Sequence, residues 1–122
     1  MTIQHVAARL VELCRDGKFL QAIDELYDDN IVSTELMSMP NMPAEISGKV
    51  TVRGKSEWWM QNNIVHACGA SDPLVADDWF SVLLTIDSTA KATQKRTPMK
   101  EIALYQVKNG KIVAERFFYA VS

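Results

Sequence analysis

The stretch from Glu101 to Tyr119 reads EIALYQVKNGKIVAERFFY. Its centre, Lys108-Asn109-Gly110, is a strong hairpin signal, because asparagine and glycine tolerate the positive φ angles of tight turns. Apolar, β-branched and aromatic residues dominate on both sides of this centre. The pattern therefore predicts two antiparallel strands, at residues 100–107 and 112–121.

A second hairpin is predicted just before the first. Residues 79–89 form a long strand-like run, and the polar segment 91–97 follows it as the hairpin tip. If the tip lies near Thr93-Gln94, alternation places one set of side chains on a common inner face. This set is apolar except for a glutamate and a tyrosine, and comprises Phe80, Val82, Leu84, Ile86, Glu101, Ala103, Tyr105 and Val107. On the opposite face, Asp87 and Lys100 are predicted to pair across the strands.

Two turn geometries are possible before the last strand, and they direct different side chains to the inner face of the sheet. A two-residue turn directs Ala114, Arg116 and Phe118 inward. A three-residue turn with Gly110 as a bulge instead directs Glu115, Phe117 and Tyr119 inward. We favour the second solution.

Helical patterns dominate the first half of the chain. Apolar residues recur at helical spacing over 3–15 and over 19–27, with Asp16-Gly17 as a stop signal between them. A third helix is predicted over 55–68, with Ser56 as its N-cap. Short strands are predicted at 31–36, 46–52 and 73–76. This order predicts an α+β fold in which three helices pack on one face of a curved antiparallel sheet.

Composition narrows the class of protein. The 122 residues are 48% hydrophobic and 23% charged, which suits one globular domain spanning 1–122. A net charge of -2 without a Lys/Arg stripe argues against partners such as nucleic acid or an anionic membrane. Every apolar run is far shorter than the roughly 20 residues of a membrane helix. The first residues lack the pattern of a signal peptide, so we expect a cytoplasmic protein.

The two cysteines, Cys14 and Cys68, are both predicted to lie reduced within helices. Neither belongs to a CxxC motif or to a Cys/His cluster with metal-ligand spacing. The sequence also has no Gly-rich phosphate-binding loop. We therefore expect neither a metal nor a cofactor.

Two segments resemble a known family. The segment GKFLQAIDELYDDNIVSTE at 17–35 resembles the second helix and first strand of ketosteroid isomerases and SnoaL-like polyketide cyclases. The segment 101–119 resembles the two C-terminal strands of SnoaL-like domains. Together with the order of elements, the resemblance covers nearly the whole chain. It implies a cone-shaped NTF2-like (cystatin-like) fold that encloses an apolar pocket, and a homodimer formed through the outer face of the sheet.

The resemblance also implies a general base. In ketosteroid isomerases the catalytic aspartate lies eight residues after the tyrosine that closes the second helix, and counting from Tyr27 gives Glu35. Desolvation beside an apolar cavity raises the pKa of a carboxyl toward neutrality. The alternative is a solvated glutamate at a strand end. The family's two oxyanion donors fall here at Leu10 and Ala103, so steroid isomerisation by that mechanism is not expected.

Two further residues are candidates for acid/base chemistry. Glu101 faces inward and serves either as a carboxyl held in apolar surroundings or as a partner in an ion pair with a helix or with Arg116. His66 shares a face with Trp59 on the predicted third helix, so it is either an acid/base partner at the mouth of the pocket or an ordinary surface residue.

Aromatic residues are the predicted walls for a flat or cyclic ligand, although each could instead belong to the core. They are Trp58, Trp59, Tyr105, Phe117 and Tyr119. The resulting hypothesis is a cofactor-independent isomerase, cyclase or dehydratase that acts on a small apolar cyclic or carbonyl compound. The alternative is a non-catalytic ligand-binding or dimerisation module of the same fold.

Overall fold

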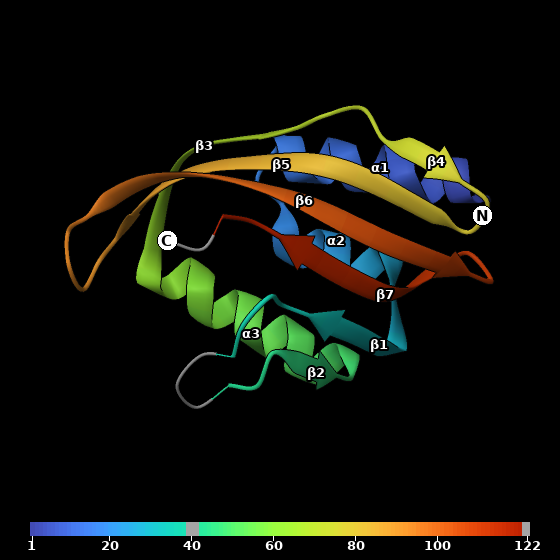
Figure 1. Ribbon diagram of the computed structural model, residues 1–122, viewed down its shortest axis with the longest axis horizontal. Helices are drawn as coiled ribbons and strands as arrows, with labels where there is room; N and C mark the ends of the chain where they lie inside the picture. Colours follow the sequence, from blue (N-terminus) through green and yellow to red (C-terminus); the bar gives the residue numbers. More distant parts are fainter. Residues whose placement is uncertain (39–41, 121–122) are drawn as a thin grey trace.

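The computed structural model describes residues 1–38 and 42–120. Three helices and a curved, open, seven-stranded sheet make up this part of the chain (Figure 1). The elements are α1 (Ile3–Arg15), α2 (Phe19–Leu26), β1 (Tyr27–Thr34), β2 (Glu45–Ser47), α3 (Lys49–Asn62), β3 (Asn63–Ala70), β4 (Leu74–Ala76), β5 (Trp79–Ala90), β6 (Arg96–Lys108) and β7 (Lys111–Phe118). The predicted α+β fold is confirmed.

Helix α1 has the predicted bounds. The Thr2 hydroxyl caps its N-terminus by accepting a hydrogen bond from the backbone N–H of His5. At its other end Gly17 has φ +71°, a left-handed conformation that glycine adopts without steric cost. Helix α2 follows and ends at Leu26, and β1 begins directly at Tyr27, four residues earlier than predicted.

The predicted third helix, 55–68, is wrong at both ends. Helix α3 begins at Lys49 and ends at Asn62, so Ser56 lies inside it and is not its N-cap. The helix starts directly after Gly48, whose φ of +93° ends the short strand β2. Residues 63–70 form strand β3, which pairs with β5, because sheet pairing and the β-branched Ile64-Val65 outweigh the helical spacing. Cys68 therefore lies on a strand, whereas Cys14 is buried in α1 as predicted; both are free thiols.

The sheet runs in the order β2-β1-β7-β6-β5-β3, with β4 paired to β5. The prediction of a purely antiparallel sheet is wrong in one place, because β1 and β7 pair in parallel. This pairing joins the start of the sheet to its last strand. As a result, side chains of β1 lie near those of β7 although they are far apart in sequence; Tyr27 and Glu115, for example, are 88 residues apart and hydrogen-bonded.

The long β5–β6 hairpin has the predicted faces. Register pairs Phe80 with Tyr105 and Val82 with Ala103, and these four side chains are buried. The predicted ion pair between Asp87 and Lys100 is wrong, since Lys100 lies opposite Thr85. Asp87 instead binds Arg96 through two hydrogen bonds of 2.8 and 3.0 Å.

The last strand directs the favoured set of side chains inward, but the bulge responsible is not at Gly110. The turn at Asn109-Gly110 has two residues, both with positive φ, so Gly110 is not a bulge. The extra residue is Val113, which lies between the pairs Gln106↔Ala114 and Val107↔Ile112. This bulge in β7 reverses the alternation beyond it. Glu115 is consequently buried and Arg116 is exposed. Strand β7 ends at Phe118, and residue 121 of the predicted strand lies outside the described residues.

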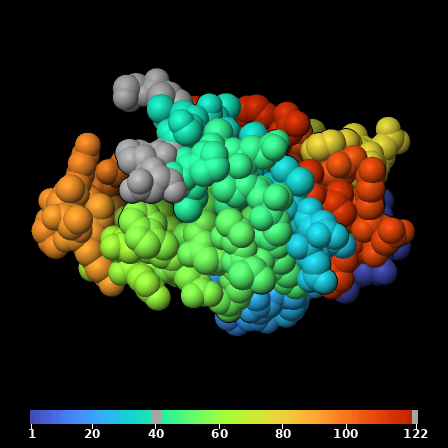
Figure 2. Space-filling view, turned by 90° about the horizontal axis from the view of Figure 1, so that it is seen from below, coloured from blue at the N-terminus to red at the C-terminus, as the bar shows by residue number. Residues whose placement is uncertain are grey.

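The helices cover the concave side of the sheet. Helix α1 crosses β3, β4 and β5, while α2 and α3 close the side formed by β1 and β2 (Figure 1). Helix α3 occupies most of the face in Figure 2, beside α2. Side chains fill the space between these layers and include the largest buried apolar groups of the described residues, namely Phe80, Leu10, Leu13, Leu26, Ile31 and Ile112. No helix of the described residues is long and apolar enough to cross a membrane.

Two glycine substitutions should change stability in opposite directions. Gly110 has φ +75°, and a Cβ there would lie 3.1 Å from the backbone oxygen of Met1, so Gly110→Ala should lower the free energy of unfolding by about 1–2 kcal/mol. Gly54 lies exposed in α3 with open space around it, so Gly54→Ala should raise that free energy by about 0.5–1 kcal/mol. Urea unfolding measures both, and a destabilised Gly54→Ala variant would contradict the helix assignment.

Candidate functional site

Three carboxyl groups face the interior from three neighbouring strands. Glu35 follows the end of β1, Glu101 lies on β6 and Glu115 on β7. Glu115 is 4% exposed and Glu101 and Glu35 are half-buried. Glu35 raises the pKa of both Glu101 and Glu115, and Glu115 also raises that of Glu101. Among the described residues, however, no three His, Cys, Asp or Glu side chains are grouped tightly enough to hold a metal ion.

Glu115 has two hydroxyl partners. Tyr27 donates a hydrogen bond to its Oε2, and Ser33, its register partner on β1, also hydrogen-bonds to the carboxyl. Burial raises the pKa of Glu115 to about 7, despite these two bonds and the nearby Lys55 ammonium, all of which favour the ionised form. Burial also raises the pKa of Tyr27 well above its usual value, so its hydroxyl stays protonated and donates.

Glu101 differs from Glu115 because its carboxyl forms no hydrogen bond with the described residues. Burial raises its pKa to about 7, and the carboxylates of Glu35 and Glu115 add to the rise. Lys55 opposes it. The predicted alternative, an ion pair with Arg116, is not formed, because the bulge at Val113 turns Arg116 to the outer face. Glu101 is thus a carboxyl with no fixed partner, near half ionisation at neutral pH.

Glu35 is tied to a cation. Lys55, from the middle of α3, donates a 2.7 Å hydrogen bond to its Oε1, and the two side chains are only 25% and 21% exposed for Lys55 and Glu35 respectively. The Tyr119 hydroxyl also bonds to the Glu35 carboxyl and accepts from the backbone N–H of Leu36. Glu35 therefore faces the interior as expected, but as the anion of a partly buried ion pair.

Tyr105 lies beside these carboxyls. Its ring stacks on Phe80 with centroids 4.9 Å apart, and its side chain is 2% exposed. It shares the inner face of β6 with Glu101 and lies opposite Glu115 of β7 in the sheet register. The pKa of Tyr105 is raised well above its usual value, chiefly by burial, so the hydroxyl remains a donor.

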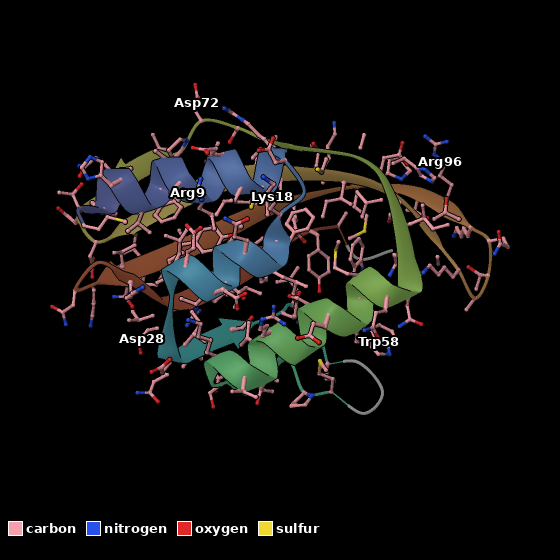
Figure 3. All side chains as sticks on the ribbon, turned by 180° about the vertical axis from the view of Figure 1, so that it is seen from behind. Arg9, Lys18, Asp28, Trp58, Asp72 and Arg96 are labelled. Atoms are coloured by element: carbon pink, nitrogen blue, oxygen red, sulfur yellow. The ribbon has the colours of Figure 1, made fainter. Side chains whose placement is uncertain are left out.

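The remaining predicted residues divide into two groups. Trp59 and Phe117 are half-buried, and Phe117 lies opposite Ala103 in the sheet. Trp58 is 59% exposed on α3 and projects away from the sheet (Figure 3). His66 is also exposed, on β3 rather than on a helix, and its Nε2 lies 2.7 Å from the Thr89 hydroxyl. The pKa values of Glu101 and Glu115 do not respond to His66.

Four members of this cluster were not predicted as site residues. They are Glu115, Tyr27, Ser33 and Lys55. The signal for Glu115 was present, because a glutamate alternates there with Phe117 and Tyr119 on the favoured inner face. For Lys55 there was no signal, since its contact with Glu35 depends on how α3 lies across β1.

Two surface hollows lie away from the three interior carboxyls. One, beside α1, is lined by Ala8, Val11, Glu12, Arg15, Asp16, Asp72 and Pro73. The other, at the start of α3, is lined by Asp29, Gly48, Lys49, Val50 and Arg53. Neither contains an interior carboxyl.

A family model described as a SnoaL-like domain matches residues 1–119. The chain belongs to the SnoaL-like domain family. A crystal structure of a proposed SnoaL-like polyketide cyclase from Mesorhizobium loti is 41% identical, with a TM-score of 0.91 over 98% of this chain and 100% of its own.

More distant structures share the fold of this SnoaL-like domain. A proposed isomerase from Bacillus subtilis is 15% identical, with a TM-score of 0.79 over 98% of this chain and 90% of its own. A proposed polyketide cyclase from Pseudomonas putida is 12% identical, with a TM-score of 0.73 over 99% and 93%. A third structure, from Xanthomonas campestris, is described as having a cystatin-like fold. No curated protein matches the chain.

The buried carboxyls should make the SnoaL-like domain less stable as pH rises. Glu101 and Glu115 have pKa values of about 7 when folded, against an ordinary value of 4.5. Between pH 4.5 and about pH 7 the folded state binds more protons than the unfolded state, so the free energy of unfolding falls as pH increases. We expect each group to cost about 2 kcal/mol between about pH 5.5 and about pH 8, measured by urea unfolding.

Glu115→Gln should remove about half of this dependence while keeping an acceptor for Tyr27. Glu45→Gln, at an exposed position on β2, is the matched control and should leave the dependence unchanged. The ion-paired Glu25, whose pKa is lowered to about 2, loses its contribution only below this pH window. A wild-type stability that rises from about pH 5.5 to about pH 8 would contradict the burial of the two carboxyls.

Proposed function

We propose that this SnoaL-like domain is a cofactor-independent acid/base enzyme of the isomerase or cyclase type, acting on a small carbonyl compound. The observation that carries the proposal is the pairing of Glu101 with Tyr105. Glu101, whose pKa burial raises to about 7, shares the inner face of β6 with Tyr105, whose hydroxyl stays protonated because its pKa is raised well above the usual value. General acid/base catalysis requires a proton carrier poised near the working pH and a donor for the developing oxyanion.

The proposed step is a balanced proton transfer. The Glu101 carboxylate takes a proton from the carbon next to the substrate carbonyl, and the electron pair of the broken C–H bond forms an enolate. The Tyr105 hydroxyl donates a hydrogen bond to the enolate oxygen, because its own pKa is too high for it to ionise. In a substrate with a C=C bond next to the reacting carbon, the enolate is conjugated with it, and Glu101 returns the proton to the far carbon, which shifts the double bond and gives an isomer. In a substrate with a second carbonyl group, the enolate carbon attacks that carbonyl carbon and closes a ring, and Glu101 gives its proton to the alkoxide that forms.

Glu35, the base that the resemblance implied, has a different part in this proposal. Its carboxylate is already held by the Lys55 ammonium at 2.7 Å, so it has a partner that a substrate would have to displace. The Glu35–Lys55 pair instead adjusts the field at Glu101: Glu35 raises the pKa of Glu101 and Lys55 lowers it. We assign Glu35 and Lys55 as positioning residues.

The test is exchange of α-protons for deuterium in a panel of small cyclic ketones and polyketide-like diketones, followed by NMR. We expect Glu101→Gln to lower the exchange rate at least about 100-fold. Glu45→Gln, the exposed control, should leave it unchanged. Glu35→Gln should retain activity but shift the midpoint of the pH–rate profile downward, because a carboxylate that raises the pKa of Glu101 is lost.

Two outcomes overturn the proposal. If Glu35→Gln abolishes exchange and Glu101→Gln does not, Glu35 is the base. If no compound exchanges although compounds bind, the domain is a non-catalytic ligand-binding module. The two surface hollows beside α1 and at the start of α3 lie away from the carboxyls, which favours this second candidate function.

We also propose that the protein forms a homodimer through the outer face of its sheet. Three exposed apolar side chains, Leu83, Ile102 and Phe118, lie directly opposite one another on β5, β6 and β7. They form a continuous apolar row across the middle of the sheet, which a second copy can cover.

Ile102→Lys, at the centre of this row, should convert the dimer to a monomer at micromolar concentration in light scattering. Leu74→Lys is the control, because Leu74 is equally apolar and more exposed but lies on β4, outside the row. A wild-type monomer, or the same loss of dimer in both variants, would refute this interface.

A further inference from the structure

Helix α3 differs from the other two helices in how it is held to the molecule. Of its 14 residues, all of which the structure describes, only Val52 is buried, whereas α1 buries six of its 13 residues. Two apolar side chains of α3, Val50 and Trp58, are instead 87% and 59% exposed. Because the burial of apolar area is the main source of tertiary stability, the core holds α3 less firmly than α1.

The local sequence of α3 adds little stability of its own. Gly48 at its N-cap has no side chain to cap the first turn, and the helix has no acidic residue in its first turn and no basic residue in its last. Gly54 lies in its interior, where glycine is destabilising relative to alanine. A helix of this length with such a sequence depends on contacts with the rest of the protein.

Ionic contacts provide much of the attachment. Arg53 binds both carboxylate oxygens of Asp24 on α2, at 2.7 and 3.1 Å, and the Lys49 ammonium donates to the backbone oxygen of Asp24 at 2.9 Å. Lys55 holds Glu35, just beyond the end of β1, at 2.7 Å. Exposed and half-exposed ion pairs of this kind stabilise a protein only modestly, and salt weakens them.

The two ends of α3 are anchored to the sheet by backbone hydrogen bonds. The Gly48 N–H donates to the carbonyl of Ile31 on β1 at 2.8 Å, and the carbonyl of Asn62 accepts from the N–H of Lys91, just after β5, at 3.0 Å. Gly48 has φ +93°, a conformation that glycine adopts without strain. The helix therefore has fixed ends, while ionic contacts hold the part between them.

The middle of α3 lies beside the interior carboxyls. The Lys55 ammonium meets Glu35 and is close enough to Glu101 and Glu115 to favour their ionised forms. Neither surface hollow contains any of these carboxyls. The proposed reaction therefore needs space beside Glu101 that the two hollows do not supply. Among the three helices, α3 buries the fewest side chains and is the one that gives way most readily.

We propose that α3 is a lid, which lifts from β1 between its two anchored ends, breaks its ion pairs with Asp24 and Glu35, and uncovers the inner face of the sheet near Glu101. The inference rests on the proposed function in that this opening admits the substrate, and it adds a conformational step to the reaction. Local opening of a weakly held element supplies such a step while α1 and the rest of the core stay folded.

The one buried side chain of α3 offers a direct probe of this motion. Val52→Cys replaces it with a thiol, and the native Cys14 is the internal control, because it is buried in α1. Iodoacetamide alkylates a buried thiol only when the protein opens around it, and peptide mass spectrometry separates the two sites. We expect the introduced thiol to be alkylated at least about 100-fold faster than Cys14.

Loss of an ion pair should make the lid open more often. Asp24→Asn in the Val52→Cys protein removes the charge that holds Arg53, so alkylation of the introduced thiol should rise about 2- to 5-fold, with the α1 thiol unchanged. Asp72→Asn is the matched control, because it breaks the 3.0 Å pair with Arg15 on α1 and should leave the rate unchanged. Salt at about 1 M, where the Debye length is about 3 Å, should act as Asp24→Asn does.

Hydrogen exchange of the wild-type protein needs no substitution. We expect the amides of α3, corrected for their intrinsic rates, to exchange at least about 100-fold faster than the buried amides of α1, through an opening that responds little to urea. Equal protection of the two helices, or an α3 exchange rate that follows urea as global unfolding does, overturns the inference. Circular dichroism and the urea midpoint verify that the variants are folded.

Equal alkylation of the two thiols also overturns the inference, because α3 would then open only with the whole molecule. So does an Asp24→Asn variant that speeds alkylation of Cys14 as much as that of the introduced thiol. None of these measurements involves a substrate, so they are separate from the deuterium-exchange assay of the proposed function. Opening of α3 without exchange of any ketone rejects the enzyme alone, whereas ketone exchange without opening of α3 rejects the lid alone.

Discussion

The hydrogen bond from the Tyr27 hydroxyl to the buried Glu115 carboxyl ties the first strand of the sheet to the last. A buried carboxyl is tolerated only where donors replace its lost hydration, and β1 supplies two of them, Tyr27 and Ser33. The contact requires β1 and β7 to run in parallel, in the register that places Ser33 opposite Glu115. With that pairing made, the end of β1 carries Glu35 to the interior side of the sheet, where Lys55 from α3 meets it.

The bulge at Val113 is the local feature that makes this contact possible. If β7 paired regularly without this bulge, with Val113 opposite Gln106, the two-residue turn at Asn109-Gly110 would direct Arg116 inward and Glu115 outward. Tyr27 would then lose its acceptor, and a guanidinium would face Tyr105 and Glu101. The bulge at Val113 therefore determines which side chains of β7 face the interior, both the charged residue and the aromatic ones.

Local patterns in the sequence predicted the parts of the fold that depend on spacing. Helix α1, the faces of the β5–β6 hairpin and the inward position of Glu101 follow from periods of 3.6 and 2 residues. Long-range pairing was not predictable in the same way. The segment 63–68 has a helical spacing but becomes β3 because β5 offers a partner strand. The Lys55–Glu35 pair depends on the packing of α3. His66 was predicted to lie on a helix and to face the pocket, but it is an exposed residue of β3.

The three interior carboxyls differ in one respect that bears on chemistry, namely whether a partner already holds them. Glu115 is held by Tyr27 and Ser33, and Glu35 by Lys55 and Tyr119. Glu101 has no such partner, although burial and repulsion keep its proton near the point of half ionisation. Such a group destabilises the folded state whenever it ionises, and binding a substrate is what would compensate that cost. We therefore assign proton transfer to Glu101, which no partner holds, rather than to Glu35, which lies at the family's usual position.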